Sequence, residues 1–85
     1  MGAAPNARGQ RAYTELMDAD DYKIVLYRQD GGWVAEIPAI PGCYALMPTR
    51  DEALRELPRV FAVIAEEYRE RGAILPSDTT EFVNA

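Results

Sequence analysis

Few side chains in this 85-residue chain could perform chemistry. The sequence has no histidine, one cysteine (Cys43), one serine (Ser77) and one lysine (Lys23). Without histidine, neither the thiol nor the hydroxyl has the usual general base that activates a nucleophile. Cys43, at the start of a predicted strand, is better explained as a small buried apolar residue. We therefore expect a protein that is not an enzyme and needs no cofactor.

Two carboxylates allow one catalytic alternative, in which the protein is a metal-dependent hydrolase. Asp30 lies in a predicted turn, and Glu36 lies in the strand that follows it. Such a pair could bind a divalent ion, although oxygen ligands alone are an uncommon choice for zinc. No other carboxylate lies inside the first three predicted strands, so this remains only an alternative.

The charge and hydropathy of the chain indicate which partners it can bind and where in the cell it is expected. Nine basic residues against 14 acidic ones give a net charge of −5, whereas nucleic-acid phosphates are bound by basic surfaces. We expect no nucleic-acid binding by this domain alone, and an acidic domain suits a basic protein partner. No apolar run approaches the ~18 residues of a membrane span, and residues 1–10 lack the apolar centre of a secretory signal. With a single cysteine, these features predict a cytoplasmic protein.

The patterning predicts one small α+β domain at residues 11–85, after a disordered tail at 1–10. Asp-Gly-Gly at 30–32 is a hairpin signal, and Pro41-Gly42 is a turn signal. Runs of β-branched and aromatic residues predict the strands, and apolar spacing allows a short N-terminal helix. The predicted strands are 22–28, 33–37, 43–47 and a short final one at 79–83, and the short helix is 11–18.

One long helix is predicted over residues 50–71. Thr49 and Glu52 fit a capping box at its start, and Gly72 suits the position after its end. Apolar residues recur through this span at steps of three and four. Pro58 removes a backbone donor inside the helix, but the apolar spacing keeps its phase across it. We therefore predict a single kinked helix rather than two helices.

Three short motifs follow one another along the chain. They are Gly-Gly-Trp-Val at 31–34, Pro-Ala-Ile-Pro-Gly-Cys at 38–43 and Thr-Arg-Asp-Glu-Ala-Leu at 49–54. In this order they resemble the HicB family, the antitoxin half of bacterial HicA–HicB toxin–antitoxin pairs. The resemblance runs over residues 22–83.

The HicB resemblance implies a βββαβ domain with a partial RNase H-like fold. It also implies a homo-oligomer, a dimer or a tetramer, that binds and blocks a small basic HicA-type RNA-cleaving toxin. Many members carry a further DNA-binding domain, for which this sequence shows no residues. The alternative is an orphan homo-oligomeric module that binds something other than a toxin.

Both faces of the predicted sheet carry apolar side chains, yet one helix covers only one face. We therefore expect the second face, with part of the helix flank, to contact a partner or another copy of the chain. Tyrosine and tryptophan are enriched at such contacts. The predicted interface residues are Tyr22, Val25, Tyr27, Trp33, Tyr44, Leu46, Val60 and Val63.

Overall fold

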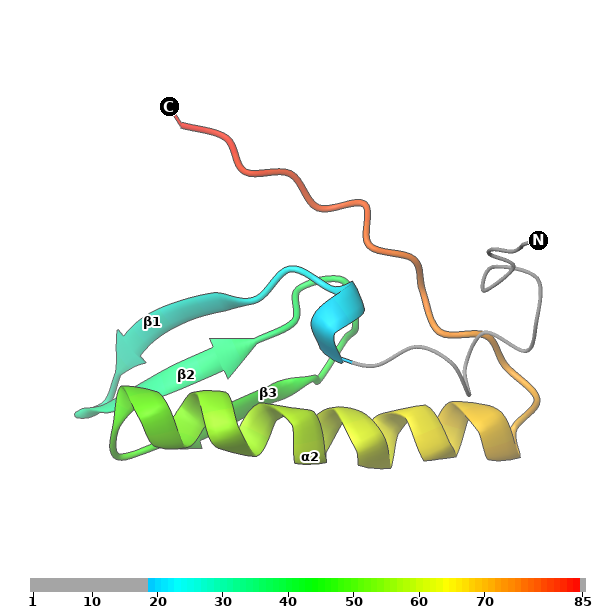
Figure 1. The fold of residues 1–85 in the computed structure, drawn as a ribbon, viewed down its shortest axis with the longest axis horizontal. Helices are drawn as coiled ribbons and strands as arrows, with labels where there is room; N and C mark the ends of the chain where they lie inside the picture. The colour runs from blue at the N-terminus through cyan, green and yellow to red at the C-terminus, as the bar shows by residue number, and fades with distance from the viewer. Residues whose placement is uncertain (1–18, 85) are drawn as a thin grey trace.

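The structure, a computed structural model, describes residues 19–84. It confirms the α+β prediction, because a three-stranded antiparallel sheet is followed by one long helix (Figure 1). Successive strands are neighbours in the sheet, in the order β1-β2-β3. The elements are a short 3₁₀ turn η1 (Ala19–Asp21), β1 (Val25–Gln29), β2 (Gly32–Glu36), β3 (Tyr44–Met47) and α2 (Arg50–Glu70).

The β1–β2 hairpin turns at Asp30 and Gly31, as the sequence predicts. Both residues have positive φ, 53° and 80°. Two successive residues with positive φ match the twist of the flanking strands, which explains the preference for Asp-Gly here. Gly32 then starts β2, where a Cβ atom would lie 2.7 Å from the Met47 carbonyl oxygen. Only glycine lets β3 approach β2 this closely.

The loop between β2 and β3 is held by its own backbone. The Ile37 N–H donates to the Cys43 carbonyl, and the Ile40 N–H donates to the Ile37 carbonyl. The Cys43 N–H donates to the Ile40 carbonyl across Pro41-Gly42, with Gly42 at a φ of 79°. This is the geometry of a type II turn. Ile37, Ile40 and Cys43 are at most 1% exposed, so the loop closes one end of the core.

Helix α2 begins at Arg50, as the sequence predicts, and ends at Glu70, one residue before the predicted end. The Glu52 N–H donates to the Thr49 hydroxyl, and that hydroxyl donates to the Glu52 carboxylate. At the other end, Gly72 has a φ of 69° and its N–H donates to the Arg69 carbonyl. The helix is a single element with Pro58 inside it, on its exposed side.

The core lies between α2 and one face of the sheet, so the domain has two layers (Figure 1). Small side chains meet within this core: Ala35 and Ala53 are fully buried. They let the helix axis approach the sheet closely. The larger Leu57 and Phe61 fill the space beyond them and are also buried.

The predicted final strand, 79–83, is wrong. Residues 73–84 form no strand and leave the body as an extended segment (Figure 1). Asp78 explains the difference, because its carboxylate accepts the backbone N–H groups of Lys23 and Thr80. A side chain thus occupies the position where a fourth strand would begin to pair. The predicted tail at 1–10 and short helix at 11–18 lie outside the described residues.

Substituting Gly32 tests the close approach of β3. Gly32→Ala should lower the free energy of unfolding by about 1–3 kcal/mol, because the new methyl group clashes with the Met47 carbonyl. Gly31→Asn is the matched control, since asparagine tolerates positive φ and nothing lies within 4 Å of that position. Its effect should stay below about 1 kcal/mol in urea unfolding. Equal effects at the two glycines would contradict the close-approach explanation.

Replacing Pro58 should stabilise the helix. Pro58 has no N–H for the Leu54 carbonyl, and its exposed ring adds little to the core. Pro58→Ala should raise the free energy of unfolding, by up to about 3 kcal/mol. Arg59→Ala, at the next exposed position, should change it by no more than about 0.5 kcal/mol. A Pro58→Ala variant that is no more stable than the wild type would show that the proline ring packs usefully.

Candidate interaction surface

The face of the sheet opposite α2 carries two rows of side chains. Each row contains one residue from each of the three strands. The register aligns Tyr27, Val34 and Leu46 across the three strands. It aligns Val25, Glu36 and Tyr44 in the neighbouring row. We call these six residues the outer sheet face. Strand alternation places them on the side away from the helix.

Large apolar and aromatic side chains of the outer sheet face reach solvent. Tyr27 is 40% exposed, Tyr44 54% and Leu46 46%. Val34, at the centre, is only 2% exposed although it lies outside the core cluster under α2. Its neighbours therefore cover it from the sides. They form a shallow hollow of about 270 Å³, which is lined by all residues of the outer sheet face except Val25, and by Gln29.

One hydrogen bond crosses the outer sheet face diagonally. The Tyr27 hydroxyl donates to Glu36 Oε1 at 3.0 Å. The bond stabilises the neutral phenol beside a carboxylate and raises the pKa of Tyr27. It holds a negatively charged group among the aromatic side chains. The surface therefore combines an apolar area with one oriented carboxylate.

Tyr22 does not belong to the outer sheet face, which corrects one predicted interface residue. It is 6% exposed and lies in the core, with its ring 5.8 Å from that of Phe61. Its hydroxyl donates to the Pro76 carbonyl at 2.7 Å. Burial, and then the charge of Asp21, raises the pKa of Tyr22 to about 12. This tyrosine ties the C-terminal segment to the domain.

Trp33 lies on the helix side of the sheet and not on the outer sheet face. The register pairs it with Arg28 on β1 and Met47 on β3. It is half-buried and packs against the core, with the Arg28 guanidinium 5.5 Å from its ring. Because β2 alternates, Trp33 and Val34 must point to opposite faces. The aromatic ring of Trp33 therefore packs at the edge of the core.

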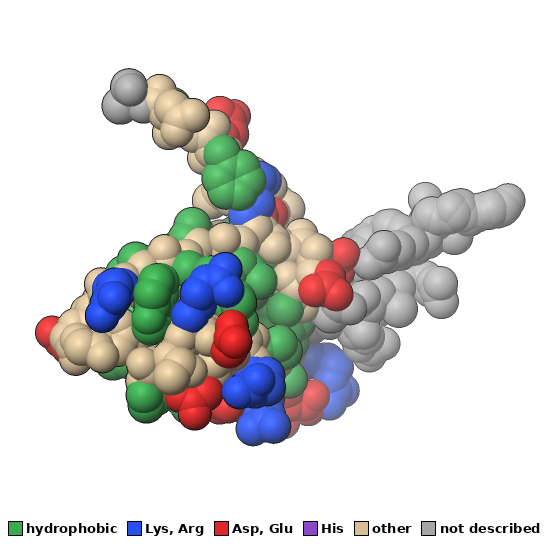
Figure 2. Space-filling model, turned by 60° about the vertical axis from the view of Figure 1, so that its left-hand side comes forward, with side chains coloured by type: hydrophobic (Ala, Val, Ile, Leu, Met, Phe, Trp, Pro, Cys, Tyr) green, Lys and Arg blue, Asp and Glu red, His purple; other side chains and the backbone are tan. Residues whose placement is uncertain are grey.

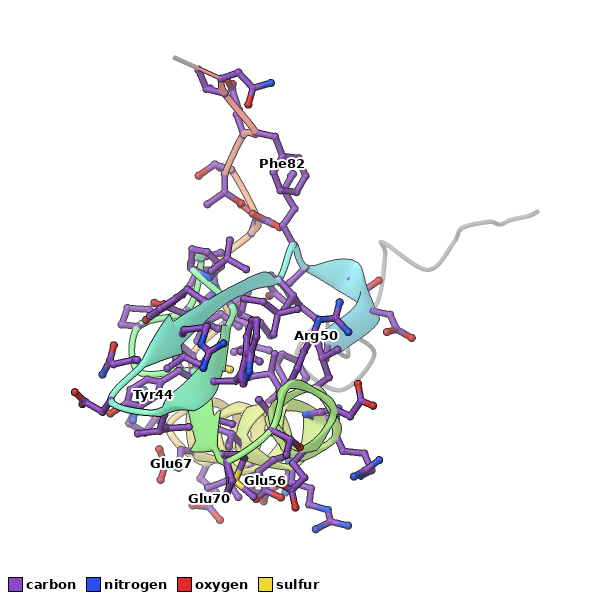
Figure 3. All side chains as sticks on the ribbon, turned by 90° about the vertical axis from the view of Figure 1, so that its left-hand side faces the viewer. Tyr44, Arg50, Glu56, Glu67, Glu70 and Phe82 are labelled. Carbon is purple, nitrogen blue, oxygen red and sulfur yellow. The ribbon has the colours of Figure 1, made fainter. Side chains whose placement is uncertain are left out.

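The two predicted helix residues also lie apart from the outer sheet face. Val60 is partly buried against the core, whereas Val63 is 60% exposed on α2. Ion pairs on the helix join Arg59 to Glu56 and Arg69 to Glu66. Figure 3 shows Glu56, Glu67 and Glu70 projecting from α2 on the side away from Phe82. These charges form a solvent-facing surface separate from the outer sheet face.

The side chains that could perform chemistry do not converge. Cys43 is fully buried, as predicted, and burial raises the pKa of its thiol. Asp30 lies in the hairpin turn, and Glu36 lies at the far end of β2. The strand between them spans about 13 Å at roughly 3.3 Å per residue, too far for one ion to bridge. Within residues 19–84, no group of three metal-ligating side chains is close enough to hold an ion.

The exposed side chains that the sequence prediction missed lie in the C-terminal segment. Ile74 is 68% exposed, Phe82 76% and Val83 79%. Figure 2 shows hydrophobic side chains on the part of this segment that projects from the body, and Figure 3 shows Phe82 there. The sequence pattern predicts a strand that includes Phe82 and Val83, and a strand in the sheet would leave these side chains less exposed.

Relatives place the chain in a family of small proteins. The UPF0150 protein ssl0259 of Synechocystis sp. is 43% identical over 63 residues, which cover 73% of this chain and 86% of the relative. This chain belongs to the UPF0150 family. The UPF0150 protein Ta0767 of Thermoplasma acidophilum is 28% identical over 63 residues, 73% of this chain and 91% of that protein.

Two further comparisons give no match for this UPF0150 protein. No protein-family model matches the chain, and no solved structure matches it. The names of the two relatives state no ligand, reaction or partner. Within the described part of this UPF0150 protein, no helix is long and apolar enough to cross a membrane.

Acid should weaken the attachment of the C-terminal segment. Hydrogen bonds from the Thr80 hydroxyl and the Lys23 N–H lower the pKa of Asp78 from 3.8 to about 2. A lowered folded-state pKa stabilises the fold above the unfolded value of 3.8, and this stabilisation disappears as the pH falls towards about 2. Urea unfolding across this range should therefore show a smaller loss of stability in Asp78→Asn than in the wild type.

Glu81→Gln serves as the control for the acid experiment, because it removes an exposed carboxylate from the same segment. This variant should lose stability with acid as the wild type does. An Asp78→Asn variant whose pH dependence matches that of the wild type would contradict the role of Asp78.

Proposed function

We propose that this protein is a HicB-like antitoxin that binds a small basic HicA-type RNA-cleaving toxin and blocks its active surface. The proposal is carried by the outer sheet face, an exposed aromatic and apolar area that α2 does not cover. Aromatic side chains at the centre of such an area are typical of interaction hot spots. The protein performs no reaction, and its location is the cytoplasm, where a toxin that cleaves RNA would act.

Charge favours a basic toxin over a second copy as the occupant of this face. Glu36 lies within the face, and the chain carries a net charge of −5. Two copies packed symmetrically through this face would bring two Glu36 carboxylates towards each other. A basic partner would instead supply a counter-charge and would be attracted at long range. Blocking would then be steric, aided by electrostatic complementarity.

The motifs of the HicB resemblance support the same proposal through the fold. The Pro-Gly turn at 41–42 and the Thr49 cap hold β3 and α2 in their places. β3 in turn contributes Tyr44 and Leu46 to the outer sheet face. The residues that carry the resemblance are thus the scaffold of the proposed interface rather than its contact residues.

Removing one apolar side chain from the outer sheet face tests this function. The toxin gene neighbouring this one should be co-expressed, and its product should co-purify with the wild-type protein and lose its toxicity. Leu46→Ala should weaken that complex at least about tenfold, measured by calorimetry, because an exposed apolar contact beside Val34 is lost. The free energy of unfolding should change little, since Leu46 is 46% exposed.

Val63→Ala is the matched control, an exposed apolar residue on the other layer. It should leave toxin binding unchanged. Equal effects of the two substitutions would move the interface away from the sheet. A genomic neighbourhood with no small basic protein that binds would contradict the antitoxin function and favour an orphan binding module.

A further inference from the structure

The C-terminal segment is anchored at one point and projects beyond it. The Asp78 carboxylate accepts the Lys23 backbone N–H at 2.6 Å, and the Lys23 ammonium lies 3.8 Å away. Thr80 donates its N–H and its hydroxyl back to Asp78. Just before this anchor, Leu75 is buried and the Pro76 carbonyl accepts the Tyr22 hydroxyl. The point at which the segment leaves the domain is therefore fixed.

Beyond the anchor, the segment exposes both side chains and backbone. We call residues 79–84 the C-terminal arm. Phe82 and Val83 are more than three-quarters exposed. Within the described chain, no backbone–backbone hydrogen bond involves the arm. Exposed apolar residues on an extended, unpaired backbone are what a strand presents before it joins a sheet.

The sheet has a free edge of suitable length and charge. β1 is the first strand in the sheet order, and no other strand within residues 19–84 pairs with its outer edge. Helix α2 packs mainly against β2 and β3 and leaves this edge uncovered (Figure 1). β1 carries Arg28, and the arm carries Glu81. An open edge of five residues with a basic side chain thus matches an acidic arm of six residues.

The anchor directs the arm away from its own β1. The Lys23 N–H lies just before β1, and a side chain rather than the arm backbone accepts it. The bonds from Thr80 to Asp78 then turn the chain at this point. Figure 1 shows the arm diverging from β1 instead of running along it. The arm can therefore reach the β1 edge of a second copy while its own anchor stays intact.

We propose that the C-terminal arm adds as an edge strand beside β1 of a second copy, and that two copies related by a two-fold axis exchange their arms. If the arm pairs antiparallel to β1 with Glu81 opposite Arg28, Phe82 comes opposite Tyr27, because side chains alternate between the two faces along both strands. Phe82 lies on the outer sheet face next to Tyr27, and Glu81 lies on the helix side next to Arg28. The interface lies along the β1 edge, adjoins the proposed toxin surface at Tyr27, and does not depend on the existence of a toxin.

A cysteine pair tests whether the arm is exchanged. A chain carrying both Arg28→Cys and Glu81→Cys is oxidised at low concentration and analysed by non-reducing electrophoresis and mass spectrometry. Cys43 is buried and does not interfere. Exchange should give a disulfide-linked dimer, because directly opposed strand positions are close enough for a disulfide. A disulfide within one chain would show that the arm folds back on its own β1 and would overturn the proposal.

Sedimentation provides the second readout and needs no cross-link. Wild-type protein should sediment as a dimer, and Phe82→Asp should weaken dimerisation at least about tenfold. Ile74→Asp is the matched control, because Ile74 is 68% exposed but lies before the anchor. It should leave the dimer intact. A wild-type chain that is monomeric across the concentration series, or a Phe82→Asp variant that dimerises normally, would overturn the proposal.

Discussion

A single helix can cover only one face of a three-stranded sheet, and the exposed outer sheet face of this protein follows from that limit. Ala35 and Ala53 let α2 lie close to the sheet, and Leu57 and Phe61 complete the contact. Because the apolar side chains of α2 are used here, the opposite sheet face has no cover within the described chain. Val34 is buried on that face only by its strand neighbours. A small domain of this kind buries a limited share of its surface and gains stability by binding.

The outer sheet face and the C-terminal arm present different kinds of surface. The outer face offers aromatic and apolar side chains around the Glu36 carboxylate, which suits contact through side chains. The arm and the β1 edge offer unpaired backbone, which suits the addition of a strand. Both surfaces fit a protein that acts by binding. The few reactive groups agree with this role, since Cys43 is buried and Asp30 and Glu36 lie at opposite ends of β2.

Asp78 illustrates how one side chain can change a topology. By accepting the Lys23 N–H, its carboxylate occupies the place where a fourth strand would begin. The same bonds lower its pKa, which favours the charged carboxylate that accepts them. Tyr22 adds a second fixed point through its bond to Pro76. The segment between these contacts is held to the domain, while the arm beyond them is available to another chain.

The sequence alone determined the features that depend on neighbouring residues. Asp30-Gly31, Pro41-Gly42, the Thr49 cap and Gly72 each set the backbone within a few positions, so the hairpin, the turn and the ends of α2 could be predicted. Only the tertiary structure decided which apolar residues are exposed. Tyr22 and Trp33 read as interface residues, yet both pack on the helix side, whereas Tyr27, Tyr44 and Leu46 stay exposed. The prediction of a final strand was wrong for the same reason. Asp78 accepts a hydrogen bond from Lys23, a residue 55 positions away, and the local sequence does not reveal this contact. Local pattern cannot specify a contact between distant parts of the chain.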